Sequence, residues 1–277
     1  MTRSRRMLAL AALAGGLFAA LGSPGAQAQD VPDIRLAGSS TIAPVMLEIG
    51  KLYEAGEGKA RIFVETGGSS KGIADLRKGL TDVAMVSREL KPSEADLTAH
   101  VIARDGIAAL IHAENPVQEI SREELRAIFT GELSNWSQAG GPDREIIVVS
   151  KGEGSATSVV LNKFLGVTAD QIKGDLVAAE NAQMIKTVSL TPDSIGYVSI
   201  GAAMIDISFG VPVKLIALGE VPATLENVAD GSYKATRPLN LVTTGAEAAE
   251  LKALVGFSKS EAVSGIIRDL SYTPVSQ

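Results

Sequence analysis

The 277-residue sequence has no cysteine, two histidines, one tryptophan and only 4% aromatic residues. Without cysteine the chain can form no disulfide bond, no thiolate metal site and no cysteine-linked lipid anchor. The two histidines, His100 and His112, stand far from any group of acidic residues with metal-ligand spacing. We therefore expect no metal, no cofactor and no histidine-based catalysis.

The N-terminus has the pattern of a secretory signal peptide. A basic segment at 2–6 precedes an apolar run at 7–21, and Ala26-Gln27-Ala28 matches the small-residue cleavage pattern. The alternative is a retained membrane anchor, but the run is shorter than the roughly 20 residues that a spanning helix needs. We predict a signal peptide at 1–28, its removal and a periplasmic location. The export route, Sec or twin-arginine, stays open.

The charge of the remaining chain argues against several partners. Removal of 1–28 takes away three arginines and no acidic residue, so the net charge of −6 becomes −9. A chain this acidic is not expected to bind nucleic acid or an anionic membrane surface. An anionic ligand would have to be held by local dipoles and one or two cations.

The order of the apolar segments predicts the fold class. Runs typical of strands alternate with helical patterns along the whole chain, which indicates an α/β protein with mainly parallel sheets. The expected strands lie at 34–37, 61–65, 82–86, 107–111, 146–149, 194–198, 213–217 and 239–242, and the main helices at 42–53, 73–78, 125–129, 159–165, 181–190, 246–255 and 259–270. There is no clear long linker, so two modest domains would be joined by strands.

Three of these strands are followed by a loop rich in glycine and serine and then by a helix. The loops lie at 38–41, 67–72 and 151–158. Glycines let the backbone approach a ligand closely, and the first N–H groups of a helix have no internal partner and favour negative charge. Because open α/β sheets bind ligands at the carboxyl ends of their strands, three such loops predict a binding site for an anion.

Several segments together resemble one family, the periplasmic phosphate-binding proteins (PstS-like) that supply phosphate ABC importers. In order along the chain they are Gly38-Ser39-Ser40-Thr41-Ile42-Ala43-Pro44, Gly68-Ser69-Ser70-Lys71-Gly72-Ile73, Asp82-Val83-Ala84-Met85-Val86-Ser87-Arg88, Ala103-Arg104-Asp105-Gly106-Ile107, Ile128-Phe129-Thr130-Gly131 with Asn135-Trp136, Gly154-Ser155-Ala156-Thr157 and Ile195-Gly196-Tyr197-Val198. The resemblance covers essentially all of the chain after 1–28.

The resemblance implies a type-2 periplasmic binding protein, with two α/β lobes joined by two crossing strands that close on a ligand. Lobe I would comprise 29–110 and 201–277, and lobe II 111–200, with the crossings near 107–111 and 199–203. The ligand contacts that it implies, together with one acceptor of our own choosing, are Ser40, Thr41, Ser69, Ser70, Ser87, Arg88, Asp105, Lys151, Ser155, Ala156 and Thr157.

The sequence departs from the family at two positions, both in the loop at 151–158. Lys151 stands where the family usually has arginine, and Ala156 where it has glycine. The methyl group of Ala156 is tolerable in a helical backbone but obstructive at positive φ. Some members have an aspartate at the position of Arg88 that accepts the proton of phosphate, and Asp105 is our candidate for a replacement acceptor.

Simpler interpretations of these residues stay open. Ser69 and Ser70 could only cap a helix, Arg88 could pair with Asp105 or Glu89, and Lys151 could pair with a neighbouring acid.

For the protein as a whole, we expect a monomer that binds inorganic phosphate and contacts membrane permease subunits of an ABC importer. A binding protein for another oxyanion or a small carboxylate, and a phosphate sensor, are the alternatives. A phosphatase or esterase is disfavoured, since no Gly-x-Ser-x-Gly motif surrounds Ser155.

Overall fold

The computed structural model describes residues 31–56, 60–245 and 248–275, so the predicted signal peptide lies outside the described residues. The strands are β1 (Asp33–Gly38), β2 (Arg61–Thr66), β3 (Val83–Val86), β4 (Thr98–His112), β5 (Ile147–Ser150), β6 (Leu176–Val177), β7 (Ser194–Ser199), β8 (Val213–Ile216), β9 (Thr236–Thr243) and β10 (Thr273–Pro274). The α-helices are α1 (Ala43–Gly56), α2 (Ser69–Arg77), α3 (Arg122–Thr130), α4 (Ala156–Leu165), α5 (Asn181–Leu190), α6 (Ile200–Ser208), α7 (Leu225–Ala229), α8 (Ala249–Phe257) and α9 (Ser264–Asp269). The expected α/β class is confirmed. Across the described ranges, no helix combines the length and apolar character that crossing a membrane requires.

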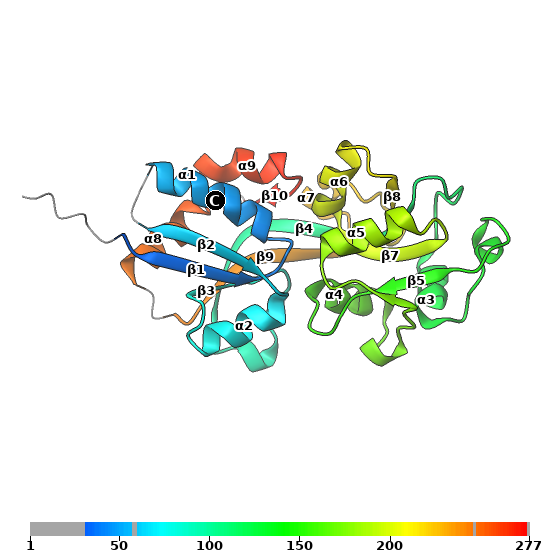
Figure 1. The fold of residues 1–277 in the computed structure, drawn as a ribbon, viewed down its shortest axis with the longest axis horizontal. Coiled ribbons are helices and arrows are strands. Elements are labelled where there is room, and N and C mark those ends of the chain that lie inside the picture. Colours follow the sequence, from blue (N-terminus) through cyan, green and yellow to red (C-terminus); the bar gives the residue numbers. More distant parts are fainter. Residues whose placement is uncertain (1–30, 57–59, 246–247, 276–277) are drawn as a thin grey trace, which may run out of the picture. The chain divides into compact units, whose positions relative to one another are not determined.

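The strands pair in the order β2-β1-β3-β9-β4-β7-β5-β6, and β8 and β10 each pair with β4. The first part of β4, as far as Gly106, pairs with β9, and its last part, from Ile107, pairs with β7 and β8. Figure 1 shows β4 passing between two sets of strands. We call β1, β2, β3, β9, β10 and the first part of β4 the first strand group, and β5, β6, β7, β8 and the last part of β4 the second strand group.

The pairing is mixed rather than mainly parallel. The outer pairs β1–β2, β1–β3, β5–β6 and β5–β7 are parallel, as expected of strands connected through helices. The pairs that involve β4 and β9 are antiparallel. These two strands lie in the middle of the order, so the sequence pattern of alternating strands and helices did not reveal their direction.

Both faces of the first strand group are covered by helices. Neighbouring residues of a strand point to opposite faces, and β3 follows this rule. Val83 and Met85 belong to a core with residues of α1, α8 and α9, whereas Ala84 and Val86 pack with residues of α2. Figure 1 shows α1 and α9 on one side of the strands and α2 on the other. Burial on both faces explains why β3 is apolar throughout.

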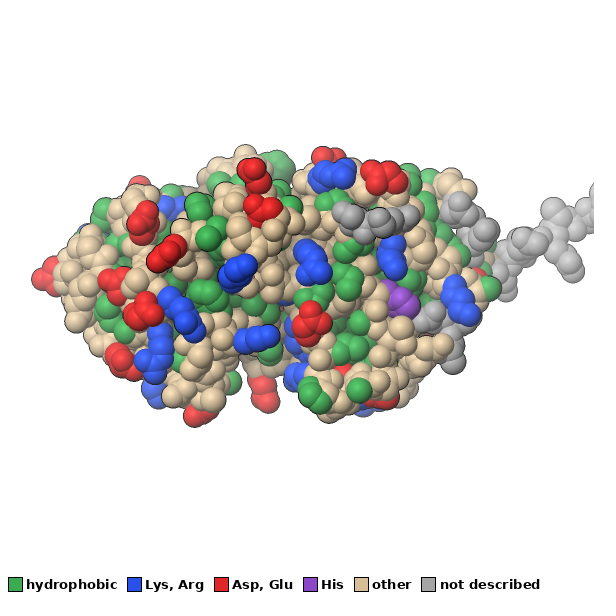
Figure 2. Space-filling view, turned by 180° about the vertical axis from the view of Figure 1, so that it is seen from behind, with side chains coloured by type: hydrophobic (Ala, Val, Ile, Leu, Met, Phe, Trp, Pro, Cys, Tyr) green, Lys and Arg blue, Asp and Glu red, His purple; other side chains and the backbone are tan. Residues whose placement is uncertain are grey.

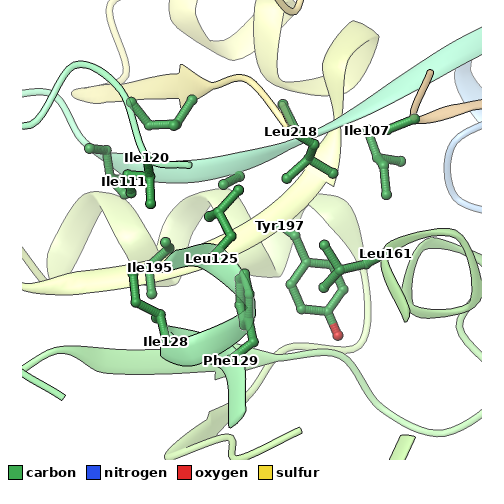
Figure 3. Packing of buried hydrophobic residues seen from close by; sticks show 14 of the residues in the cluster. Ile107, Ile111, Ile120, Leu125, Ile128, Phe129, Leu161, Ile195, Tyr197 and Leu218 are labelled. Atoms are coloured by element: carbon green, nitrogen blue, oxygen red, sulfur yellow. The ribbon is translucent and has the colours of Figure 1, made fainter. Parts of the chain in front are cut away.

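The second strand group is also buried on both faces. Ile107 and Ile111 of β4 face a core that includes residues of α3 and α4, and Leu110 between them faces residues of α5. Within the first of these cores, the ring of Tyr197 on β7 packs edge-on against Phe129, with ring centroids 5.5 Å apart. Figure 3 shows Tyr197 among these side chains. The hydroxyl group of Tyr197 accepts a hydrogen bond from the backbone N of Lys151 at 2.9 Å.

The expected elements are largely present, with differences at their ends. Ser121 begins α3 with a capping box: its Oγ accepts a hydrogen bond from Glu124 N at 3.2 Å, and Glu124 Oε2 accepts one from Ser121 N at 2.8 Å. The single helix expected at 259–270 is a 3-10 turn at Glu261–Val263 followed by the short α9. Trp136 is fully buried, and its Nε1 donates to Asp193 O at 2.8 Å, so this side chain belongs to the core.

Candidate functional site

The three loops singled out in the sequence meet around one small cavity of about 20 Å³. They follow β1, β2 and β5 and lead into α1, α2 and α4. The lining residues from the first strand group and its loops are Ser39, Ser40, Thr41, Gly68, Ser69 and Ser87, and those from the second are Lys151, Ser155, Ala156, Thr157, Ala179 and Glu180. Eight of the eleven residues expected to bind a ligand are therefore brought together here.

Hydrogen bonds among the serines fix the wall that the first strand group provides. Ser69 Oγ accepts from Ser87 N at 3.1 Å, which ties the start of α2 to the end of β3. Ser39 Oγ donates to Ser87 Oγ at 2.8 Å and accepts from Thr41 N at 3.2 Å. These hydroxyl groups are held in place before any ligand arrives, a condition that favours tight binding.

Arg237, at the start of β9, provides a buried cation that the sequence analysis did not identify. It is 1% exposed, and its Nε and Nη2 donate to Asp105 Oδ2 at 2.9 and 2.7 Å. Its Nη1 donates to Thr157 Oγ1 and its Nη2 to Thr41 Oγ1, each at 3.0 Å. The guanidinium thus contacts hydroxyl groups of both strand groups directly behind the cavity.

These contacts decide what the Thr41 hydroxyl can offer a ligand. A hydroxyl has one O–H to donate and two lone pairs that accept. Thr41 Oγ1 accepts from Arg237 Nη2 and also from Asn181 Nδ2, each at 3.0 Å. With both lone pairs engaged, its own hydrogen is left to donate. A ligand atom that accepts hydrogen bonds suits this donor, and the charged oxygens of an anion are such atoms.

Lys151 provides a second cation at the cavity. Its Nζ donates to Asn181 Oδ1 at 3.0 Å, and its backbone N donates to Tyr197 Oη at 2.9 Å. The pKa of the Lys151 ammonium is lowered to about 7, chiefly by burial and in addition by nearby Arg237, while Glu180 opposes the shift. A bound anion would favour the charged form. The charge of this lysine is therefore coupled to occupancy of the site.

Three expected contact residues do not line the cavity. Arg88 is buried and pairs with Glu94 through bonds of 2.7 and 2.8 Å, a partner that the sequence analysis did not consider. The carboxylate of Asp105 accepts from Arg237 through Oδ2, and Asp105 does not line the cavity. Ser70 Oγ donates to Gly154 O at 3.1 Å and joins the second and third loops.

Comparison with known proteins identifies the family. Residues 23–262 match the PBP superfamily domain. The phosphate-binding protein PstS of Borreliella burgdorferi is 30% identical over 219 residues, which cover 76% of this chain and 78% of the relative. The phosphate-binding protein PstS of Bacillus subtilis is 28% identical over 87% of this chain and 80% of its own length. The chain belongs to the PstS-like proteins of the PBP superfamily.

Solved structures of PstS-like proteins agree with this assignment. A protein assigned as a phosphate ABC transporter substrate-binding protein from Clostridium perfringens, solved with bound phosphate, matches with a TM-score of 0.82. It is 29% identical, and the match covers 88% of this chain and all of that one. An ABC-type phosphate transport receptor from Vibrio cholerae matches with a TM-score of 0.71 at 32% identity, over 87% of this chain and all of that one.

The two unusual residues of the third loop can now be placed in this PstS-like structure. Ala156 is the first residue of α4, and it is not among the described residues with positive φ. The backbone at Ala156 is therefore not in the positive-φ conformation in which a methyl group would be obstructive, and alanine is tolerated at this position. Lys151 keeps a positive charge at the cavity but lacks the planar fork of an arginine. Arg237 carries such a fork on another element, but it donates to Asp105, Thr41 and Thr157 and does not line the cavity.

Only weak signals in the sequence pointed to the residues that were missed. Arg237 and Pro238 directly precede an apolar strand, and a charged residue at the entrance of a buried strand requires a partner. Asp105 was that partner, but it lies 132 positions away in the chain. Glu180 and Asn181 stand at the start of α5, where they look like ordinary capping residues.

Proposed function

We propose that this protein binds inorganic phosphate, or a closely related tetrahedral oxyanion, in the cavity between the two strand groups. The observation that carries this proposal is the set of donors around the cavity. Thr41 has its lone pairs engaged, α2 and α4 begin at the cavity with N–H groups that lack internal partners, and Lys151 lies beside them. Hydroxyl and N–H donors can replace the hydration shell of an oxyanion.

The similarity to the C. perfringens protein with bound phosphate supports the same ligand class. Of the two cations, Arg237 is already paired with Asp105, so Lys151 is the cation that lines the cavity and can compensate a charge of the ligand. Binding without further chemistry is part of the proposal. The hydroxyl of Ser155 accepts from Ser158 N as a helix cap, so its contacts are those of a structural serine.

We further propose that the two strand groups are lobes that part and close around the ligand. One water needs about 10–15 Å³ of cavity, so a tetrahedral oxyanion enters a cavity of about 20 Å³ only if its walls separate. The lobe connections would be β4 near residues 106–107 and the chain near 235–237. The second of these lies beyond the expected 199–203, because β8 pairs with the last part of β4.

The biological role follows from the family. We propose that the protein acts as a monomer in the periplasm, after removal of 1–28, and delivers its ligand to the permease subunits of an ABC importer. Figure 2 shows basic and acidic side chains interspersed over one face of the molecule, which supports a small-molecule ligand over nucleic acid.

Calorimetric titration of the purified protein with phosphate, arsenate, sulfate and small carboxylates tests the proposed function. We expect one site per chain with phosphate or arsenate as the tightest ligand. A tighter site for sulfate or for a carboxylate would replace phosphate by that anion, an alternative that Lys151 and Ala156 motivate. Absence of anion binding would refute the proposal.

A further inference from the structure

Asn181, the first residue of α5, connects the cation of the site to the opposite strand group. Its side chain is buried, with 4% of the residue exposed. Oδ1 accepts from Lys151 Nζ and Nδ2 donates to Thr41 Oγ1, each at 3.0 Å. Lys151 follows β5 in the second strand group, and Thr41 precedes α1 in the first. One amide therefore joins two residues that line the cavity, although it does not line the cavity itself.

We propose that Asn181 is a positioning residue of the anion site, which holds the Lys151 ammonium in place and fixes the Thr41 hydroxyl as a donor toward the ligand. This inference rests on the proposed function. It adds a residue that neither the loops nor the motifs indicated. It also gives the contact between the two strand groups a role in arranging the site.

The direction of each hydrogen bond determines what Asn181 does to its two partners. An amide has one end that accepts and one that donates, and this amide faces an ammonium, which only donates, and a hydroxyl. The ammonium fixes the orientation of the amide, because Nζ requires the acceptor Oδ1. Nδ2 is then the end that faces Thr41. The Thr41 oxygen must accept this bond, so its hydrogen points elsewhere.

The remaining partners of these groups support the assignment. Arg237 Nη2 donates to the other lone pair of Thr41 Oγ1. Asn181 and Arg237 together therefore leave the Thr41 hydroxyl only its hydrogen, so it can act only as a donor to the ligand. The charged groups that act on Lys151 are Arg237 and Glu180, and Tyr197 Oη accepts from the backbone of Lys151 rather than from its ammonium. Among the described contacts of the Lys151 ammonium, the uncharged group that accepts a hydrogen bond from Nζ is therefore the amide oxygen of Asn181.

Two variants, Asn181→Asp and Asn181→Ala, distinguish a positioning role of Asn181 from a packing role, because the two roles predict opposite orders of phosphate affinity. Aspartate has nearly the shape of asparagine, so a purely structural role predicts a mild effect for Asn181→Asp and a larger one for Asn181→Ala. Positioning predicts the reverse order. The carboxylate would accept the Thr41 hydrogen, turning it away from the ligand, and would place a negative charge beside the anion. We expect phosphate affinity to fall about 10-fold in Asn181→Ala and about 100-fold or more in Asn181→Asp.

Asn115→Asp is the matched control. Asn115 is also buried, and its Oδ1 accepts from Val117 N at 3.0 Å, a bond that aspartate can keep. It does not line the cavity, so phosphate affinity should stay within about 2-fold. Thermal unfolding of each variant without phosphate checks that it is folded.

A double-mutant cycle provides a test that does not need the aspartate variant. Thr41→Val removes the hydroxyl that Asn181 directs. We expect the losses from Thr41→Val and Asn181→Ala to be non-additive by about 5-fold or more, because both remove the same donor. Additive losses, or an Asn181→Asp variant that binds phosphate as tightly as Asn181→Ala, would overturn the inference. If the unchanged protein bound no phosphate, the proposed function would fail first, and this inference with it.

Discussion

Arg237 and Asp105 lie directly opposite each other on the antiparallel strands β9 and β4. Two nitrogens of the guanidinium donate to Asp105 Oδ2, and both side chains are 1% exposed. Gly201 N, at the start of α6, approaches the other carboxylate oxygen at 3.5 Å. The ion pair therefore joins the two strands at the boundary of the strand groups, and the same guanidinium reaches Thr41 and Thr157 at the cavity.

We predict that Arg237→Met alone lowers the free energy of unfolding more than the double variant that removes both charges of the pair. The single variant leaves the Asp105 carboxylate buried without a partner, which costs about 3–5 kcal/mol in the free energy of unfolding. The double variant with Asp105→Asn removes this charge and should recover part of the loss. Denaturant unfolding of both proteins measures the difference. Equal stability of the single and double variants would show that the carboxylate does not depend on Arg237.

The buried Arg88–Glu94 pair should affect stability without affecting the ligand. Arg88 donates to both carboxylate oxygens of Glu94 and to Glu89 O, and it does not line the cavity. Arg88→Met should lower the free energy of unfolding by about 3 kcal/mol or more, because Glu94 loses its partner. Phosphate affinity, measured at a temperature where the variant is folded, should stay within about 2-fold. A loss of 10-fold or more would return Arg88 to the set of ligand contacts.

The parts of the fold and the site that the sequence predicted are those set by local patterns. The loops at 38–41, 67–72 and 151–158 were found because glycine, serine and a following helix are neighbours in the chain. The strand expected at 82–86, which is β3, was found for a similar reason, since its apolar residues are neighbours in the chain. Each of these features is decided within a few residues.

The parts that the sequence did not predict depend on partners that a turn or strand pairing brings together. Asp105 was expected to face the ligand, because nothing near it indicated that Arg237 would take its carboxylate. Likewise, the partner of Arg88 is Glu94 only because the 3-10 turn at Pro92–Glu94 brings that carboxylate back. Antiparallel pairing of β4 with β9 decides the first of these contacts, and a single sequence carries little information on such pairing.

Ser155 should contribute both to stability and to binding. Its Oγ caps α4 through Ser158 N, and the residue lines the cavity. Ser155→Ala should therefore cost about 0.5–2 kcal/mol in the free energy of unfolding and weaken phosphate binding by about 1–3 kcal/mol. Ser121→Ala is the matched control, since it removes the cap of α3 away from the cavity. If the two variants bound phosphate equally well, Ser155 would be only a cap.

Ala156→Gly restores the residue that is usual in the family. Because Ala156 is the first residue of α4, the backbone does not need glycine there. Phosphate affinity should change by less than about 2-fold, and the free energy of unfolding should fall by up to about 1 kcal/mol. Calorimetry and denaturant unfolding check these two expectations. An affinity gain of 10-fold or more would show instead that the methyl group obstructs the ligand.

Lys151 should make stability depend on pH in the absence of phosphate. The pKa of its ammonium falls to about 7 in the folded protein from an ordinary value of 10.5, chiefly through burial. Below pH 7 both the folded and the unfolded chain hold the proton, and the full cost of burying the charge is present. Between pH 7 and 10.5 the unfolded chain binds more protons than the folded one, so stability rises with pH. The contribution is about 1.4 kcal/mol per pH unit.

Lys151→Met should remove this rise, which denaturant unfolding at several pH values between 7 and 9 would measure as a difference in slope. The same coupling predicts that phosphate binding at pH 8 takes up a proton, because a bound dianion favours the charged ammonium. Calorimetry in two buffers of different ionisation enthalpy detects this uptake. Lys151→Arg binds without it, since an arginine stays charged throughout this range. Equal proton uptake by the two proteins would place the titrating group elsewhere, on the ligand or on another residue of the site.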